Sequence, residues 1–144
     1  MINSSISDAL LDCITQAKPK RILVGFSGGA DSSVLLHALV QLKLLQPIIA
    51  IHVHHGLSPH ANEWLLLCEK QCKTLGVGFV AERVVLSTES GSLEQAARLA
   101  RYEVFEKYVL SGDVLLLGHH QDDQIETFMM RLMRGSGMTG LTAM

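Results

Sequence analysis

Residues 25–33 read GFSGGADSS and separate an apolar, strand-like run from a run with helical periodicity. Gly28 and Gly29 allow a sharp turn and let backbone N–H groups come close to a ligand. The helix that follows would direct the positive end of its dipole at the same point, where Ser27 and Ser32 add hydroxyl groups. The stretch therefore favours a strand, a phosphate-binding turn and a helix, which is the first unit of an α/β fold.

Two other interpretations of this stretch stay open on spacing alone. Residues 25–29 also fit G-x-S-x-G, the turn that carries a nucleophilic serine in hydrolases, and the whole stretch could be an ordinary serine-capped turn. A dinucleotide-binding turn and a Walker A loop do not fit, because the glycine spacing differs and no lysine lies between Arg21 and Lys43. Asp31 suits a phosphate site if Mg²⁺ lies between its carboxylate and the phosphate, since a carboxylate alone would repel the ligand.

The rest of the chain alternates short apolar runs with helix-periodic runs. We expect strands at residues 21–26, 47–54, 77–86 and 113–118. We expect helices at residues 7–17, 32–45, 60–75, 92–110 and 122–134. This alternation indicates an α/β fold, a doubly wound parallel sheet of Rossmann-like type covered on both faces by helices. Ligands bind such sheets beyond the carboxyl ends of the strands, here after Phe26, Val53 and Gly118.

Composition limits the class of protein. Of the 144 residues, 48% are hydrophobic and 18% charged, and the formal net charge is −2, which suits a packed core but not a strongly basic nucleic-acid-binding domain. No apolar run reaches the roughly 18 residues of a membrane span, and the start does not resemble a signal peptide. The three cysteines lack framework spacing, and Cys68 and Cys72 are predicted to be core thiols. We therefore expect a cytoplasmic protein that does not bind membranes.

Residues 27–32, SGGADS, resemble the SGGxDS loop of the N-type ATP pyrophosphatases, the PP-loop superfamily. The resemblance implies an adenine nucleotide alpha hydrolase-like fold that binds ATP with Mg²⁺ and cleaves ATP between the α and β phosphates. Asp31 would be catalytic by holding the Mg²⁺ ion. The implied ATP-binding residues are Ser27, Gly28, Gly29, Ala30, Asp31, Ser32 and His54.

Three further stretches resemble the tRNA(Ile)-lysidine synthases within this superfamily. Residues 52–58 (HVHHGLS) are similar to their HVNHGLR-like segment, with a histidine pair where Asn-His is common. Residues 94–102 are similar to E-x-x-A-R-x-x-R-Y, and residues 119–137 to HHxDDQxET…RGSG. This resemblance implies that ATP adenylates C2 of the wobble cytidine in a tRNA(Ile) with a CAU anticodon, and that free L-lysine then displaces AMP. Alternatives are tRNA thiolation, although the usual C-x-x-C is absent, and a nucleotide-binding module without catalysis.

These blocks contain the remaining candidate residues. His119 is the candidate acceptor of the lysine amine proton. Asp123 and Glu126, on one face of the helix expected at 122–134, are candidates for catalysis and for orienting lysine. Candidate contacts to tRNA or phosphate are Arg98, Arg101, Arg131 and Arg134. For Arg98 and Arg101 the alternative is a solvated helix face. A zinc site built from the histidines would lack a known spacing and leave the glycine loop unexplained.

We expect residues 1–144 to form one N-terminal PP-loop domain of a longer protein. A last strand of the sheet and the tRNA-binding domains would follow Met144. The candidate partners are ATP, free L-lysine, tRNA(Ile) and, in a homodimer, a second copy of the chain.

Overall fold

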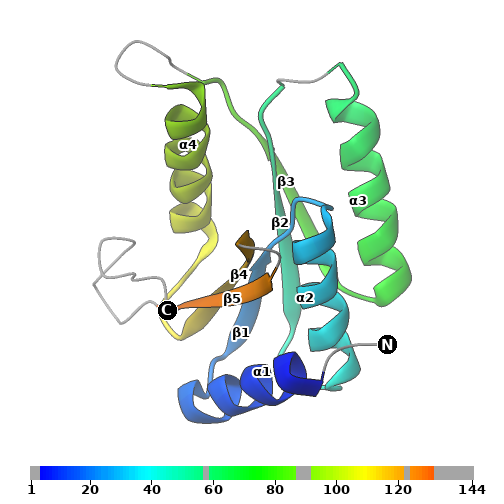
Figure 1. Ribbon diagram of the computed structural model, residues 1–144, viewed down its shortest axis with the longest axis vertical. Helices are drawn as coiled ribbons and strands as arrows, with labels where there is room; N and C mark the ends of the chain where they lie inside the picture. The colour runs from blue at the N-terminus through cyan, green and yellow to red at the C-terminus, as the bar shows by residue number, and fades with distance from the viewer. Residues whose placement is uncertain (1–3, 57–58, 87–91, 122–123, 132–144) are drawn as a thin grey trace.

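The computed structural model describes residues 4–56, 59–86, 92–121 and 124–131 (Figure 1). Its elements, in chain order, are α1 (Ser4–Ala17), β1 (Arg21–Gly25), α2 (Ala30–Gln41), β2 (Ile48–His54), α3 (Ala61–Leu75), β3 (Gly78–Arg83), α4 (Leu93–Tyr108), β4 (Asp113–Gln121) and β5 (Gln124–Arg131). Helix α2 begins at Ala30, earlier than expected, so Ser32 lies inside its first turn and does not cap it. Among the described helices, none is long and apolar enough to cross a membrane.

The strands form one sheet in the order β3-β2-β1-β4-β5. The first four of these strands are parallel, which confirms the predicted doubly wound parallel α/β sheet. The chain moves outward from β1 through β2 to β3 and then returns to the other side of β1 as β4. This reversal lies between β1 and β4, and the crevice beyond their carboxyl ends is the position where such sheets bind ligands.

The prediction of a helix over residues 122–134 is wrong for its central part, because Gln124–Arg131 is strand β5. β5 runs antiparallel to β4, with Cα partners from Gln121↔Gln124 to Val114↔Arg131. Without β5, the outer edge of β4 would leave a row of backbone N–H and C=O groups unpaired. Pairing along this edge prevails over the helical spacing of the apolar residues in the segment.

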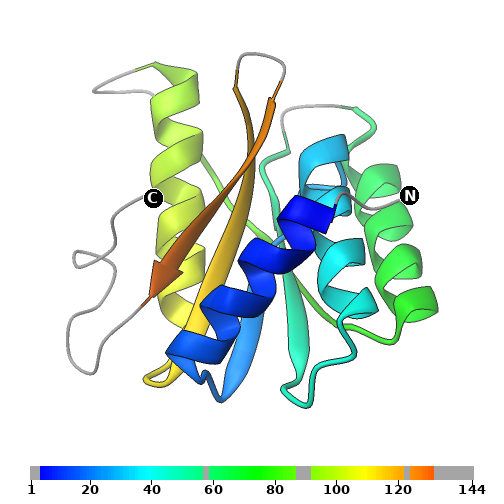
Figure 2. The same cartoon turned by 60° about the horizontal axis from the view of Figure 1, so that its bottom comes forward.

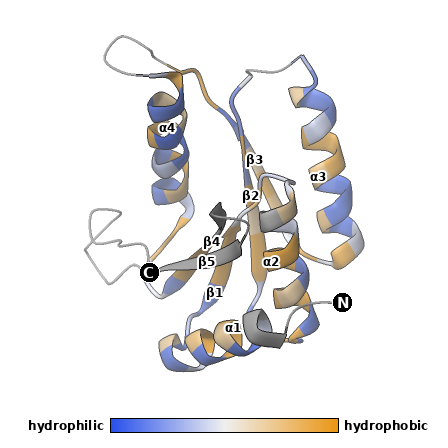
Figure 3. Ribbon diagram, viewed as in Figure 1, coloured by the Kyte–Doolittle hydropathy of each residue, from blue (hydrophilic) through white to orange (hydrophobic). Residues whose placement is uncertain are grey.

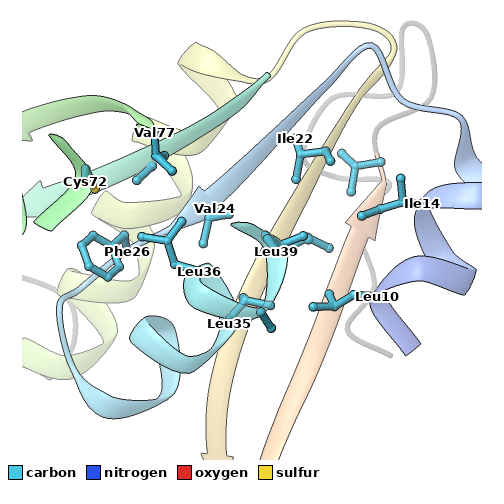
Figure 4. Close-up of a cluster of buried hydrophobic side chains, with 14 of the residues drawn as sticks. Leu10, Ile14, Ile22, Val24, Phe26, Leu35, Leu36, Leu39, Cys72 and Val77 are labelled. Atoms are coloured by element: carbon cyan, nitrogen blue, oxygen red, sulfur yellow. The ribbon is translucent and has the colours of Figure 1, made fainter. Parts of the chain in front are cut away.

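Helices cover both faces of the sheet (Figure 1; Figure 2). Helices α1, α2 and α3 pack on one face and α4 on the other, as the two buried clusters show. The side chains labelled in Figure 4 belong to the first cluster and are Leu10, Ile14, Ile22, Val24, Phe26, Leu35, Leu36, Leu39, Cys72 and Val77. The buried side chains of the second cluster are Leu23, Ile51, Val104, Phe105, Val109, Leu115 and Leu117. Burial of each large side chain contributes about 1.5–3 kcal/mol, so these clusters hold the helices on the sheet.

Local sequence signals set two helix ends. The Ser92 hydroxyl accepts a hydrogen bond from the Gln95 N–H at 3.1 Å and so caps the start of α4. Gly76 ends α3 in the left-handed conformation with φ of 75°. Cys68 and Cys72 of α3 are buried in the core, as predicted, and burial raises the pKa of each thiol to about 11.

Candidate functional site

A cavity of about 570 Å³ opens beyond the carboxyl ends of β1 and β2. Strand β2 becomes hydrophilic toward this end, where its last residues are histidine, valine and histidine (Figure 3). The cavity walls come from the end of β1, the loop into α2, the end of β2, the start of α3, one side of α4 and Leu117 of β4. Its lining includes Phe26, Ser27, Ser32, Ile51, His52, His54, His55, His60, Trp64, Arg101, Tyr102, Phe105 and Leu117. The cavity therefore lies where the sequence predicts a ligand site.

The glycine loop closes on itself through serine hydroxyls. The Ser27 N–H donates to the Ser32 Oγ at 3.2 Å, and the two hydroxyls are 3.1 Å apart. The Gly29 N–H donates to the Ser27 Oγ at 3.2 Å, and Gly28 has a φ of +84°. Gly29 is the N-cap of α2, so Ala30 and Asp31 lie in the first helical turn, whose N–H groups lack intrahelical acceptors. This arrangement is suited to binding phosphate.

The same contacts bear on the hydrolase interpretation. A nucleophilic serine needs a general base within hydrogen-bonding distance of its hydroxyl. The Ser27 hydroxyl instead bonds to the Ser32 hydroxyl and the Gly29 N–H of its own loop. The loop therefore resembles a phosphate cradle more than a nucleophile turn.

His52 and His54 are buried at the end of β2. His52 Nδ1 lies 2.9 Å from the Phe26 carbonyl oxygen and must donate its proton, since a carbonyl only accepts. Burial is the main cause that lowers the pKa of His52, and the hydrogen bond to Phe26 opposes it. His54 Nε2 lies 2.9 Å from Asn62 Oδ1, which also accepts from Arg83 at 2.8 Å. His54 must then be the donor in that contact.

His55 follows β2 and is half-buried beside Arg101 of α4. Burial lowers the pKa of His55, and the positive charge of Arg101 lowers it further. Within the described residues, the buried Nδ1 of His55 has no hydrogen-bond partner. A neutral imidazole and a guanidinium thus share one wall of the cavity.

The two predicted arginines of α4 differ in position. Arg101 lines the cavity, but Arg98 lies over the ring of Tyr102, 5.6 Å from its centroid. Tyr102 packs edge-on against Phe105, and both rings line the cavity. The structure thus brings Arg101 to the site and holds Arg98 against an aromatic ring.

The candidates on the last two strands are placed by their backbone. His119 of β4 and Glu126 of β5 are Cα partners. Arg131 is opposite Val114, near the other end of β4. Asp123 and Arg134 lie outside the described residues. In the parts of the chain that are described, no group of three His, Cys, Asp or Glu side chains could hold a metal ion.

Sequence reasoning missed Trp64 of α3. Its indole N–H donates to the Ser27 carbonyl oxygen at 2.6 Å, and its ring lines the cavity. It also missed Asn62, which accepts a hydrogen bond from His54, and Arg83, which donates to the same Asn62 oxygen. Trp64 is the only tryptophan in the chain, and the buried residues of its helix are the two cysteines. A single large aromatic residue in such a helix was the sequence signal that could have indicated a role for Trp64.

A family model described as a PP-loop domain matches residues 2–144. The chain belongs to the PP-loop family. Among curated PP-loop relatives, the tRNA(Ile)-lysidine synthase of Proteus mirabilis is 50% identical over 127 residues, covering 85% of this chain and 29% of the relative. The tRNA(Ile)-lysidine synthase of Escherichia coli O157:H7 is 51% identical over 128 residues, covering 87% of this chain and 30% of the relative. The chain thus spans about 30% of the length of the curated relatives it matches.

Two solved structures share the PP-loop fold. The NH3-dependent NAD synthetase of Campylobacter jejuni superposes with a TM-score of 0.60 at 17% identity, covering 79% of this chain and 53% of the other. The U34-tRNA thiolase of Methanococcus maripaludis gives a TM-score of 0.61 at 19% identity, covering 83% of this chain and 46% of the thiolase. At these identities the likeness concerns the fold alone.

Proposed function

We propose that this chain is the ATP-binding part of a tRNA(Ile)-lysidine synthase. The observation that carries the proposal is the glycine loop, closed by Ser27 and Ser32 at the first residues of α2, beside a cavity large enough for a nucleoside. The lysidine synthases that are about 50% identical to most of the chain support the choice of reaction.

ATP enters as its Mg²⁺ complex. Its phosphates lie against the N–H groups of residues 28–32, and its adenine lies against the end of β2, near Ile51 and His54. Asp31, in the first turn of α2, is next to these N–H groups and would face the cation that the phosphates bring with them. The apolar side chains of Ile51, Phe105 and Leu117 exclude water from the base.

The reaction has two displacements. The C2 oxygen of the wobble cytidine attacks the α phosphorus, and pyrophosphate leaves while loop N–H groups stabilise its charge. The amine of free lysine then attacks C2, AMP leaves, and the amine proton passes to His119. Asp123 and Glu126 would hold an ammonium group of lysine, and Arg101 would neutralise phosphate at the cavity wall. Arg98, Arg131 and Arg134 are assigned to tRNA or phosphate contacts.

The test substitutes Asp31 in the intact enzyme. Asp31→Ala should lower incorporation of labelled lysine into tRNA(Ile) at least a hundredfold, because loss of a charged group that acts in the transition state costs several kcal/mol. Asp12→Ala, an exposed aspartate on α1, is the matched control and should keep full activity. Normal incorporation by Asp31→Ala would refute the role of Asp31. Incorporation of sulfur rather than lysine would show that the chain belongs to a thiolating enzyme.

A further inference from the structure

Helix α3 contacts the glycine loop at one carbonyl group. The Trp64 indole N–H donates to the Ser27 oxygen at 2.6 Å, and the Cys68 thiol lies 3.7 Å from the same oxygen. Beside this carbonyl, a Cβ atom at Gly28 would lie 2.6 Å from the Cys68 Sγ and 3.0 Å from the Trp64 Nε1. The indole and the thiol therefore fill the space on one side of the Ser27–Gly28 peptide.

This contact decides how the peptide is oriented. In a trans peptide the C=O and the following N–H point in opposite directions. Since the Ser27 carbonyl is held by α3, the Gly28 N–H must point away from α3. This peptide turns over by rotation about ψ of Ser27 and φ of Gly28, and a glycine at position 28 places little steric limit on that rotation.

We propose that Trp64 is a positioning residue for the phosphate-binding loop. Its indole N–H holds the Ser27–Gly28 peptide so that the Gly28 N–H faces the phosphates of the bound nucleotide. The inference rests on the proposed function, because it takes ATP as the ligand of the loop. The inference gives helix α3, which follows β2, a role in phosphate binding. This role could not be read from the sequence of the glycine loop alone.

Trp64 also lines the cavity, so its ring could instead contact the base. The two roles respond differently to the ligand. If Trp64 orients the loop, its substitution should weaken the binding of ligands that carry β and γ phosphates. If its ring contacts the base, the substitution should weaken the binding of ATP and of adenosine equally.

The experiment compares Trp64→Phe with the unmodified 144-residue chain. Phenylalanine keeps an aromatic ring but lacks the N–H donor. Leu67→Ala is the matched control, because Leu67 is exposed on the same helix and does not line the cavity. Kd is measured by calorimetry for ATP·Mg²⁺ and for adenosine. Trp64→Phe should raise the Kd for ATP·Mg²⁺ about tenfold, equivalent to ~1.4 kcal/mol, and leave that for adenosine within about twofold.

Three outcomes are separable. An unchanged Kd for ATP·Mg²⁺ in a folded Trp64→Phe chain, or equal weakening of ATP·Mg²⁺ and adenosine, overturns the positioning role and leaves the proposed function intact. Failure of the unmodified chain to bind ATP·Mg²⁺ refutes the proposed function and this inference with it. If circular dichroism shows that Trp64→Phe does not fold, the fluorescence emission of Trp64, the single tryptophan of the unmodified chain, replaces the comparison of Kd values. Magnesium pyrophosphate should shift this emission. If saturating magnesium pyrophosphate leaves the emission unchanged, the positioning role is overturned.

Discussion

Gly28 shows at the scale of one residue why the loop sequence is so restricted. Its φ of +84° disfavours any side chain, and its Cα hydrogen faces the Cys68 thiol and the Trp64 indole. The loop is thus constrained by its own backbone and by helix α3. A second glycine, Gly76, has a similar φ of +75°, but a Cβ atom there would meet nothing within 4 Å.

This pair of glycines gives a matched prediction. Gly76→Ala should lower the free energy of unfolding by about 1 kcal/mol, the cost of a left-handed alanine. Gly28→Ala should cost about 2–3 kcal/mol, since the collision with Cys68 adds overpacking, and it should also weaken ATP·Mg²⁺ binding. Urea denaturation and calorimetry measure the two effects. Equal destabilisation by both substitutions would contradict the close approach of α3 to the loop.

At the scale of elements, an ion pair joins β1, β4 and the end of α4 at the edge opposite the cavity. Arg21 Nε donates to Asp113 Oδ1 at 3.1 Å, and the Leu110 N–H donates to Asp113 Oδ2 at 2.8 Å. A second guanidinium nitrogen of Arg21 donates to the Tyr108 carbonyl at 3.2 Å. The Asp113 side chain is 2% exposed, so its charge depends on these partners.

Asp113→Asn should therefore lower the free energy of unfolding by about 2–3 kcal/mol, because Arg21 loses the charge of the buried carboxylate with which it pairs. Lys107→Gln is the control. It removes one partner of the exposed ion pair between Lys107 and Glu82 and should have a much smaller effect. Denaturant titration of both variants measures the difference. If Asp113→Asn proves as mild as Lys107→Gln, the ion pair does not anchor these elements.

The β4–β5 hairpin shows how the sheet overrides a local signal. The apolar residues of the last segment have helical spacing, and the sequence accordingly predicts a helix there. In the fold, residues 124–131 lie along the open edge of β4 and gain a ladder of backbone hydrogen bonds. The pairing also changes which of the predicted site residues are neighbours. His119 is opposite Glu126, whereas Arg131 lies near the other end of β4.

At the scale of the whole molecule, burial of the histidines makes stability depend on pH. Burial lowers the pKa of His52 and of His55 below the ordinary value of 6.5. As pH falls through about 6.5, the unfolded chain takes up protons that the folded chain does not, so stability is lost toward acid pH. Above about pH 7.5 both histidines are neutral in both states and contribute no dependence.

The expected result is a lower Tm at pH 5.5 than at pH 7.5, with no further change from these groups up to pH 8.5. The dependence is at most about 1.4 kcal/mol per pH unit for each histidine. In His52→Asn the amide can still donate to the Phe26 carbonyl, and combining it with His55→Asn should flatten the profile. Scanning calorimetry across this range provides the measurement. A double variant with the unmodified slope would show that other groups titrate.

The features that depend on near neighbours along the chain could be predicted from the sequence. Four parallel strands, the helices between them, the Ser92 cap, the Gly76 terminus and the glycine loop all follow from apolar periodicity and from residues a few positions apart. Such signals survive in the fold because they fix φ and ψ locally. The loop motif also indicated the cavity, since parallel strands place their carboxyl ends together.

Which side chains meet could not be predicted in this way, because it depends on the assembled fold. Trp64 and Ser27 are 37 residues apart, and Arg21 and Asp113 are 92 apart. The neighbourhood of His55 and Arg101 and the strand conformation of residues 124–131 likewise depend on elements brought together by packing. No local pattern encodes these contacts, because each depends on the position of a helix or strand edge that forms only when the sheet is assembled and its core is buried.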